Sequence, residues 1–112
     1  MNVSEIQPNG LGLTLMKFNI DFDERALKEW HKLDKSIREQ FKKKLRKLQE
    51  NPYIESARLH GDLAGCFKIK LRSSGFRLVY QVIDEEIVIW VIAVGKREDS
   101  MAYDIAKKRL GV

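Results

Sequence analysis

Hydrophobic and polar residues follow clear periods from residue 16 onward. The segment KFNIDF (17–22) alternates with a period of two, which predicts a β-strand. The segment ERALKEWHKL (24–33) repeats its apolar residues at helical spacing, and Asp23 just before it is a suitable N-cap. We therefore expect a strand followed at once by a helix. The apolar positions of that helix are Ala26, Leu27, Trp30 and Leu33.

A second helical pattern begins after a short break. Ser36 and Glu39 have the S-x-x-E form of a capping box, which predicts a helix start at Ser36, and Asn51-Pro52 should end the helix near Glu50. Its apolar stripe is Ile37, Phe41, Leu45 and Leu48. Its other side carries Arg38, Lys42, Lys43, Lys44, Arg46 and Lys47. Because the link between the two helices is short, we expect a helical hairpin on one face of a sheet.

Three further strand patterns fill the second half of the chain. They span residues 66–72, 76–83 and 87–94. The last one, IVIWVIAV, is apolar at every position, which predicts a central strand covered on both faces. Ser100 is a suitable N-cap for a short final helix, whose apolar Ile105 and Leu110 should dock on the sheet. The order β-α-α-β-β-β-α predicts an α+β fold, a small antiparallel meander with the helical hairpin on one face and a short C-terminal helix.

Like charges alternate with the apolar residues of the hairpin. Lys68, Lys70 and Arg72 share one parity, and the turn decides whether Arg77 joins them. A three-residue loop would leave Arg77 among the apolar residues, whereas a two-residue Ser74-Gly75 loop, with residue 72 opposite 77, places it on the lysine face. A slip by one residue inverts every side chain, so we predict the two-residue loop. Such a face is either a solvated surface that keeps the sheet soluble or a site for a polyanion.

Composition narrows the class of protein only slightly. The 112 residues suit one domain, and 21 Lys and Arg against 16 Asp and Glu give a net charge of +5, which is compatible with nucleic-acid binding. A single cysteine excludes an internal disulfide, and no apolar segment is long enough to span a membrane, so we expect a cytoplasmic protein. Residues 1–15 lack a periodic pattern and predict a flexible extension, or a start codon assigned too far upstream, before a single domain at 16–112.

Three strings carry a family resemblance: "FDERALKEW", "KIKLRSSGFRLVYQVID" and "VGKRE" followed by a tyrosine. With these strings the chain closely resembles the RelE family of bacterial toxins over roughly residues 16 to 110. The resemblance implies a metal-independent, ribosome-dependent endoribonuclease that cuts mRNA in the ribosomal A site. In that reaction the 2′-hydroxyl attacks the neighbouring phosphate and leaves a cyclic phosphate. It also implies a RelB-like antitoxin as partner, and a toxin–antitoxin complex that binds operator DNA through the antitoxin.

The catalytic residue types of the family are all present here. They fall on Lys68, Lys70, Arg77, Arg97 and Tyr103. RNA self-cleavage needs a base, stabilisation of the phosphorane and neutralisation of the leaving oxygen. We expect Lys70 to be the base or its closest partner, with Lys68 assisting at the phosphate, since crowded positive charges favour a neutral lysine. Arg77 would stabilise the phosphorane, Arg97 the leaving oxygen, and Tyr103 would stack on or orient a nucleotide.

A second group of residues is expected to contact RNA or the ribosome. It comprises Arg72, Lys96, His60, Lys43, Lys44 and Lys47. The lysines of the second helix have two readings, a solvated helix face or a surface that follows ribosomal RNA phosphates. Two positions depart from the close family pattern, because His60 stands where that pattern has arginine and Asp99 where it has a basic residue. Both changes remove positive charge that would meet ribosomal RNA.

Other functions remain open at this level. A mechanism with two histidines would need His31 and His60 together, and their sequence contexts are unrelated. The ParE type of toxin shares the fold and acts on DNA gyrase without cutting RNA, but the complete set of catalytic residue types argues against it. A third class is a module that binds RNA or the ribosome and cuts nothing.

Overall fold

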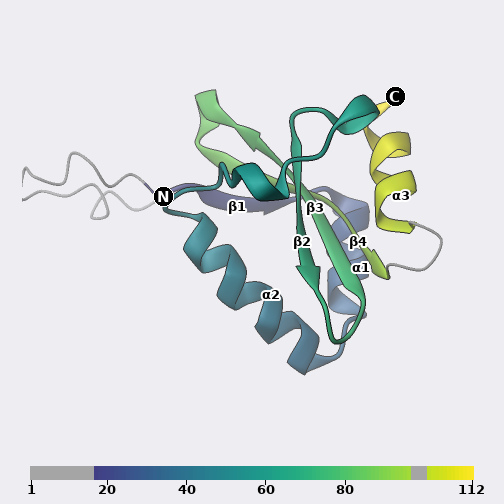
Figure 1. Cartoon of the computed structure of the whole chain (residues 1–112). Helices are drawn as coiled ribbons and strands as arrows, with labels where there is room; N and C mark the ends of the chain where they lie inside the picture. The colour runs from purple at the N-terminus through teal and green to yellow at the C-terminus, as the bar shows by residue number, and fades with distance from the viewer. Residues whose placement is uncertain (1–16, 97–100) are drawn as a thin grey trace, which may run out of the picture.

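The computed structural model describes residues 17–96 and 101–112. One mixed sheet in this part of the chain has the strand order β1-β4-β3-β2 (Figure 1). The main elements are β1 (Asn19–Phe22), α1 (Glu24–His31), α2 (Lys35–Leu48), β2 (Cys66–Leu71), β3 (Phe76–Ile83), β4 (Val88–Lys96) and α3 (Met101–Leu110). Single turns of 3-10 helix lie at η3 (Glu55–Ala57), η4 (Gly61–Leu63) and η5 (Asp84–Glu86). The predicted α+β order and the meander β2-β3-β4 are confirmed, and β1 pairs in parallel with β4.

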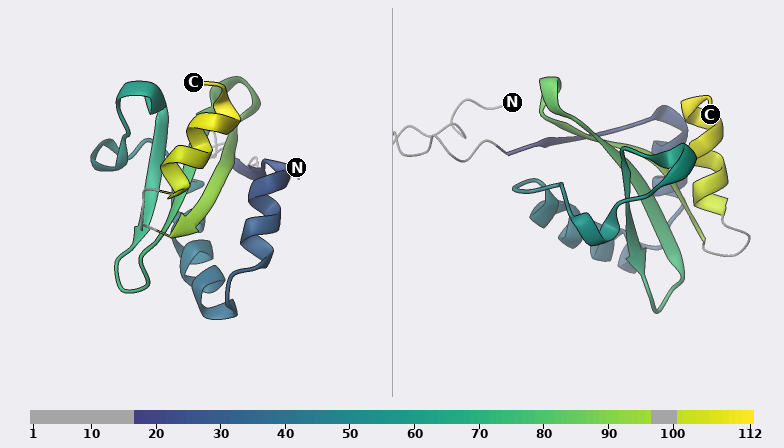
Figure 2. Two further views of the ribbon diagram at one scale, coloured as in Figure 1. Left: turned by 90° about the vertical axis from the view of Figure 1, so that its right-hand side faces the viewer. Right: turned by 45° about the horizontal axis from the view of Figure 1, so that its top comes forward.

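Helices cover both faces of the sheet, as the two views of Figure 2 show. The α1–α2 hairpin packs on one face, where Trp30 and Phe41 join the inward side chains of all four strands in one apolar cluster. On the other face α3 packs with η4 in a second cluster, which contains Leu63, Ala102 and Ala106. The sheet is therefore the middle of three layers, and the sequence correctly predicted that the hairpin and the last helix dock on it.

Strand β4 is central and covered on both faces, as its apolar sequence predicted. Ile89 and Val91 belong to the cluster under the α1–α2 hairpin, whereas Ile92 and Ala93 belong to the cluster under α3. Two consecutive residues point to the same face because the pairing with β3 shifts there, so that Ile92 is an extra residue on β4.

The two helix starts had different outcomes. The carboxylate of Asp23 accepts the backbone N–H of Arg25 at 2.9 Å, so the predicted N-cap of α1 is confirmed. The Arg25 guanidinium also bonds this carboxylate and holds its pKa near 2, below the ordinary 3.8. The predicted capping box at Ser36 is wrong, since α2 starts at Lys35 with Asp34 as N-cap, and the Asp34 carbonyl accepts the first helical bonds. Leu27, which the helical pattern placed with the apolar positions of α1, is 39% exposed.

The β2–β3 hairpin has a four-residue loop, Arg72 to Gly75, and not the predicted two-residue loop. Gly75 takes a left-handed φ of 80° and donates its N–H to the carbonyl of Leu71 at 2.8 Å, which closes the turn. Leu71 consequently faces Phe76, so the predicted pairing of residue 72 with 77 is wrong by two positions. A shift of two residues leaves each side chain on its predicted face.

Candidate functional site

A cationic pair lies near the loop end of the β2–β3 hairpin. Lys70 on β2 stands directly opposite Arg77 on β3, and Lys68 precedes Lys70 by two residues on the same face of β2. Residues directly opposite in an antiparallel pair have Cβ atoms about 4.5–5.5 Å apart, and alternate residues of a strand lie about 6.5–7 Å apart. Neither strand contains a carboxylate. Three cationic side chains thus share a region about the size of one nucleotide.

Helix α3 brings Tyr103 toward the same face of the sheet. Gly95 on β4 is the residue opposite Arg77 on its other side, and a Cβ atom at Gly95 would lie 3.6 Å from the backbone nitrogen of Ala102. Tyr103 follows Ala102 and is half-buried in the cluster beneath α3. The first turn of α3 therefore packs against β4 at Gly95, the residue that pairs with Arg77. Arg97 and Asp99, which the sequence analysis also singled out, lie outside the described residues.

A groove connects this cationic face with helix α2. It runs beside β2, the edge strand, and has a volume of about 320 Å³. Its lysines are Lys44 and Lys47 from α2 together with Lys68 and Lys70 from β2. The structure thus brings two of the predicted RNA contacts next to two of the predicted catalytic residues. Lys43 is exposed on α2 but does not line the groove.

The other predicted RNA contacts lie at the two ends of β2. Arg72 is exposed in the hairpin loop, and Lys96 at the end of β4 holds its Nζ 5.7 Å from the centre of the Phe76 ring. His60 is exposed before η4, where the neighbouring Leu59 N–H donates to the carbonyl of Cys66 at the start of β2. These three residues therefore border the catalytic candidates without joining them.

A buried hydrogen bond of Tyr80 also ties the segment before His60 to the sheet. The Tyr80 hydroxyl donates to the carbonyl of the buried Pro52 at 2.9 Å, and burial raises the pKa of Tyr80. The Tyr80 ring stacks on Phe67 with centroids 5.3 Å apart, and the Arg58 guanidinium lies 4.8 Å from the centre of the Phe67 ring. These contacts fix the segment between α2 and β2, which forms one wall of the lysine groove.

The two histidines do not form a site. His31 ends α1 on one face of the sheet, whereas His60 precedes η4, whose Leu63 packs in the cluster on the opposite face. Within residues 17–96 and 101–112, no group of three His, Cys, Asp or Glu side chains could hold a metal ion.

Sequence reasoning overlooked Gly95 as a residue of the site. A glycine within an otherwise apolar strand is a known sign of close approach by another part of the chain, and here that part is α3. The strand predicted over 87–94 stopped one residue before Gly95, so this contact was not foreseen.

Comparison with known proteins places this architecture in a family. A family model described as the ParE toxin of type II toxin–antitoxin systems matches residues 20–101. The mRNA interferase toxin RelE of Escherichia coli K12 is 60% identical over 95 residues, which cover 85% of this chain and 99% of that protein. A mutant of E. coli RelE solved in the free state has a TM-score of 0.77 at 59% identity, covering 85% of this chain and 99% of the other.

A solved toxin–antitoxin complex is also similar. The intact E. coli RelBE complex contains a chain that matches with a TM-score of 0.69 at 62% identity, covering 72% of this chain and 98% of that one. The fold, the cationic face and the family match define a toxin of a type II toxin–antitoxin system. Among such toxins this chain belongs to the RelE family, because its full-length relatives at about 60% identity are RelE proteins. No helix of the described residues has the length and apolar character to cross a membrane.

Proposed function

We propose that this protein is a ribosome-dependent endoribonuclease that cleaves mRNA in the ribosomal A site and so inhibits translation. The observation that carries the proposal is the placement of Lys70 directly opposite Arg77, with Lys68 beside them and no carboxylate on either strand. Like charges placed directly across a sheet destabilise it, so such a pair is expected where a phosphate binds between them. The similarity to RelE, which is named an mRNA interferase, supports the same reaction.

The chemistry assigned to the site is intramolecular transesterification of RNA. The 2′-oxygen attacks phosphorus as its proton leaves, the bond to the 5′-oxygen breaks, and the 5′-oxygen takes up a proton from water, so the products carry a 2′,3′-cyclic phosphate and a 5′-hydroxyl. Lys70, or Lys68 in concert with it, is assigned to take the proton, because both lie on the face of β2 that Arg77 shares, within reach of the same phosphate. Arg77 is permanently charged and can bond two phosphate oxygens at once, which suits it to the phosphorane.

Two more residues complete the proposed catalytic group. Arg97 is assigned to the leaving oxygen, by the family resemblance and because it directly follows Lys96 at the end of β4. Tyr103 is assigned to stacking on or orienting a nucleotide beside the phosphate, which its half-buried place next to Ala102 supports. Nothing in this group bends free RNA into line for attack, so the ribosome supplies that positioning.

Binding to the ribosome is proposed to use the lysine groove. Lys44 and Lys47 extend the positive face from β2 onto α2, which favours a path for RNA phosphates over a merely solvated helix. Arg72, Lys96, Lys43 and His60 are proposed as further contacts at its borders. The protein would act in the cytoplasm, where ribosomes are. The solved RelBE complex supports a RelB-like antitoxin as its partner. By the family resemblance, the complex of the two would bind operator DNA through the antitoxin.

The experiment that tests this function is primer extension on a defined mRNA in a reconstituted translation system. The wild-type protein should produce cuts inside codons only when ribosomes are present. Lys70→Ala and Arg77→Ala should each lower the cleavage rate by roughly 100- to 1000-fold while the melting temperature is retained. Lys28→Ala is the matched control, since Lys28 is exposed on α1 at the opposite face of the sheet. Normal cleavage by both folded site variants would contradict the mechanism.

Two alternative functions predict other results in the same assay. A ParE-like toxin, the name carried by the matched family model, would leave mRNA intact and inhibit DNA gyrase in a supercoiling assay. A non-catalytic module would bind ribosomes equally well with and without Arg77 and produce no cuts. The identity of about 60% to RelE over 99% of that protein favours the endoribonuclease.

A further inference from the structure

We propose that Glu29 and Arg109 form a clamp that positions α3, and with it Tyr103, beside Lys70 and Arg77. They are positioning residues, because both lie outside the cationic face and act through the helix that carries Tyr103. The proposal rests on the function proposed above, in which Tyr103 touches the RNA. It assigns a role in the reaction to two residues 80 positions apart in the sequence.

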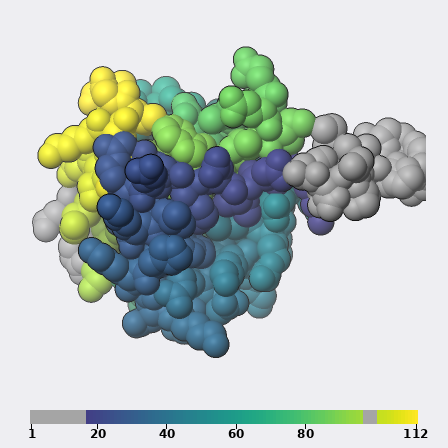
Figure 3. All heavy atoms as spheres, turned by 180° about the vertical axis from the view of Figure 1, so that it is seen from behind, coloured from purple at the N-terminus to yellow at the C-terminus, as the bar shows by residue number. Residues whose placement is uncertain are grey.

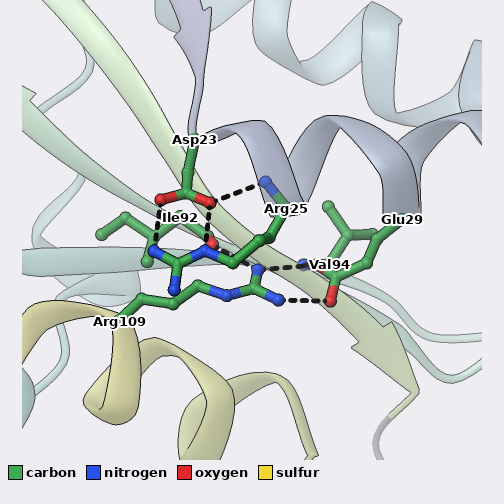
Figure 4. A network of polar contacts seen from close by, with 6 residues as sticks. All are labelled: Asp23, Arg25, Glu29, Ile92, Val94 and Arg109. Atoms are coloured by element: carbon green, nitrogen blue, oxygen red, sulfur yellow. Dashed lines mark hydrogen bonds and ion pairs between the residues drawn. The ribbon is translucent and has the colours of Figure 1, made fainter.

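The clamp is a two-pronged ion pair with two additional backbone contacts (Figure 4). The Arg109 guanidinium donates to Glu29 Oε1 at 2.9 Å and to Oε2 at 2.8 Å. The same guanidinium donates to the carbonyl of Ile92 at 2.8 Å, and Glu29 Oε1 accepts the N–H of Val94 at 3.1 Å. Three elements, α1, β4 and α3, are thus joined at one point. The fixed fork of arginine makes this geometry directional, which a lysine cannot reproduce.

The clamp lies where β4 runs on beyond the end of its neighbour. Strand β1 ends at Phe22, and the N–H of Asp23 makes the last bond along that edge, to the carbonyl of Val91. Beyond this point side chains bond the β4 backbone in place of a neighbouring strand. The Arg109 guanidinium donates to the Ile92 carbonyl, and the Glu29 carboxylate accepts the Val94 N–H. Helices α1 and α3 cover opposite faces of the sheet and meet around this edge, where they lie side by side in Figure 3.

Because the clamp is mostly buried, its ion pair is stronger than one on the surface. The Arg109 side chain is 11% exposed and that of Glu29 is 25% exposed, so water screens the pair only in part. The nearby pair of Asp23 and Arg25 offers a contrast, because the Arg25 side chain is 59% exposed and this pair does not reach α3. Only the first pair connects a helix on one face of the sheet to a helix on the other.

Helix α3 gains from such an attachment because its large apolar side chains are buried only in part. Its fully buried side chains are Ala102 and Ala106, whereas α2 buries Ile37, Phe41, Leu45 and Leu48. The larger Tyr103, Ile105 and Leu110 of α3 pack against the same cluster but stay partly exposed, so they bury less apolar surface than the core side chains of α2. The Gly95–Ala102 contact fixes the first turn of α3, and the clamp fixes its last turn. Together they define where Tyr103 stands.

Neutral variants of the clamp should slow cleavage without weakening ribosome binding. Glu29→Gln and Arg109→Gln each remove the ion pair, and a displacement of about 1 Å at the site can cost up to about 100-fold in rate, so we expect kcat to fall roughly 10- to 100-fold. KM for programmed ribosomes should change by less than about threefold, since neither residue belongs to the lysine groove. Arg109→Lys keeps the charge but loses the fork, so it should restore little of the rate.

The decisive measurement combines the clamp variants with Tyr103→Ala. If the clamp acts by positioning Tyr103, then Glu29→Gln should lower kcat less than about twofold in the Tyr103→Ala background, a non-additivity expected of residues that act together. Arg25→Gln is the matched control, which should leave cleavage at the wild-type rate. Amide hydrogen exchange should become faster in α3 of the clamp variants, while β3 stays protected.

Each other outcome overturns the clamp. Normal kcat in folded Glu29→Gln and Arg109→Gln, or equal losses with and without Tyr103, would show that these residues do not position it. If Tyr103→Ala itself cleaves normally, the clamp proposal fails together with the role of Tyr103, while cleavage lost on Arg77→Ala would still support the endoribonuclease. If a neutral variant does not fold, Arg109→Lys supplies the same comparison with the charge retained.

Discussion

Substitution of Gly95 tests how closely α3 must approach the sheet. A Cβ atom at this position would lie 3.6 Å from the backbone nitrogen of Ala102 and 3.8 Å from its Cα and Cβ atoms, all of which are ordinary contact distances. Gly95→Ala should therefore fit without displacing the helix. It should also stabilise the protein by up to about 1 kcal/mol, because glycine inside a strand carries a conformational cost of about 0.5–1 kcal/mol.

Compared with alanine, valine at position 95 has two additional methyl groups. They reach about one bond length beyond the Cβ atom, toward the backbone of Ala102. Either the core absorbs the overlap, at a cost of about 1–3 kcal/mol, or the first turn of α3 moves away from β4. Movement of this turn carries Tyr103 away from Arg77, which lies opposite position 95. We expect the valine variant to lose roughly 100-fold in cleavage rate and the alanine variant to stay within about threefold of wild type.

The two variants form a matched pair for one assay. Cleavage rates from primer extension on programmed ribosomes are compared with melting temperatures, so that loss of activity can be separated from loss of fold. A folded Gly95→Val protein that cleaves at the wild-type rate would refute the dependence of the site on the position of α3. So would an alanine variant that is less active than the valine variant, because its Cβ atom meets nothing closer than 3.6 Å.

Three further predictions concern stability and binding. Tyr80→Phe removes a buried hydrogen bond to Pro52, whose carbonyl keeps a second donor, so the free energy of unfolding should fall by about 1 kcal/mol in urea titrations, with the m-value unchanged. Asp23→Ala should cost about 1 kcal/mol through loss of the N-cap. Because the folded-state pKa of Asp23 is about 2 against an ordinary 3.8, its charge stabilises the fold above about pH 4 and this contribution is lost as the pH falls toward 2; Asp23→Asn should flatten that part of the curve of stability against pH. Lys44→Glu with Lys47→Glu should reduce the salt dependence of ribosome binding by about one unit of logarithmic slope per lost phosphate contact, whereas an unchanged slope would mean that the helix face is merely solvated.

Alternation along the chain predicted the faces of the sheet but not the pairing of its strands. A period of two fixes which side of the sheet each residue occupies. The residues of β2 and β3 that were predicted to face the core all pack toward the α1–α2 hairpin, namely Phe67, Ile69, Leu71, Phe76, Leu78 and Tyr80. Cys66 and Val79 are buried on the other face, under α3. The same period cannot distinguish registers that differ by two residues. The difference between a two-residue and a four-residue loop depends on the left-handed conformation of Gly75 and its bond to Leu71, which are local backbone details.

The candidate site was predictable to the extent that it lies on one hairpin. Lys68, Lys70 and Arg77 were recognised from 10 residues of continuous sequence, because alternation together with a loop of even length puts them on one face. The contacts that surround them depend on elements distant in the chain. The lysine groove needs α2 beside the edge strand, and the bond between Glu29 and Arg109 spans 80 residues, so neither has a local pattern that sequence reading could detect.

The cationic face is either a solvated surface or an anion-binding site, and the position of its strands in the sheet distinguishes these two interpretations. Lysines on an edge strand are a common protection against unwanted pairing, and β2 is an edge strand, so Lys68 and Lys70 alone would fit a solvated surface. Arg77 does not fit that reading, because it lies on β3, an interior strand with neighbours on both sides. Edge protection needs no cation there. Arg77→Gln should therefore keep the melting temperature while cleavage is lost, as measured by thermal unfolding and primer extension on the same preparation. A variant that loses stability but cleaves RNA normally would mean that Arg77 serves the fold and not the reaction.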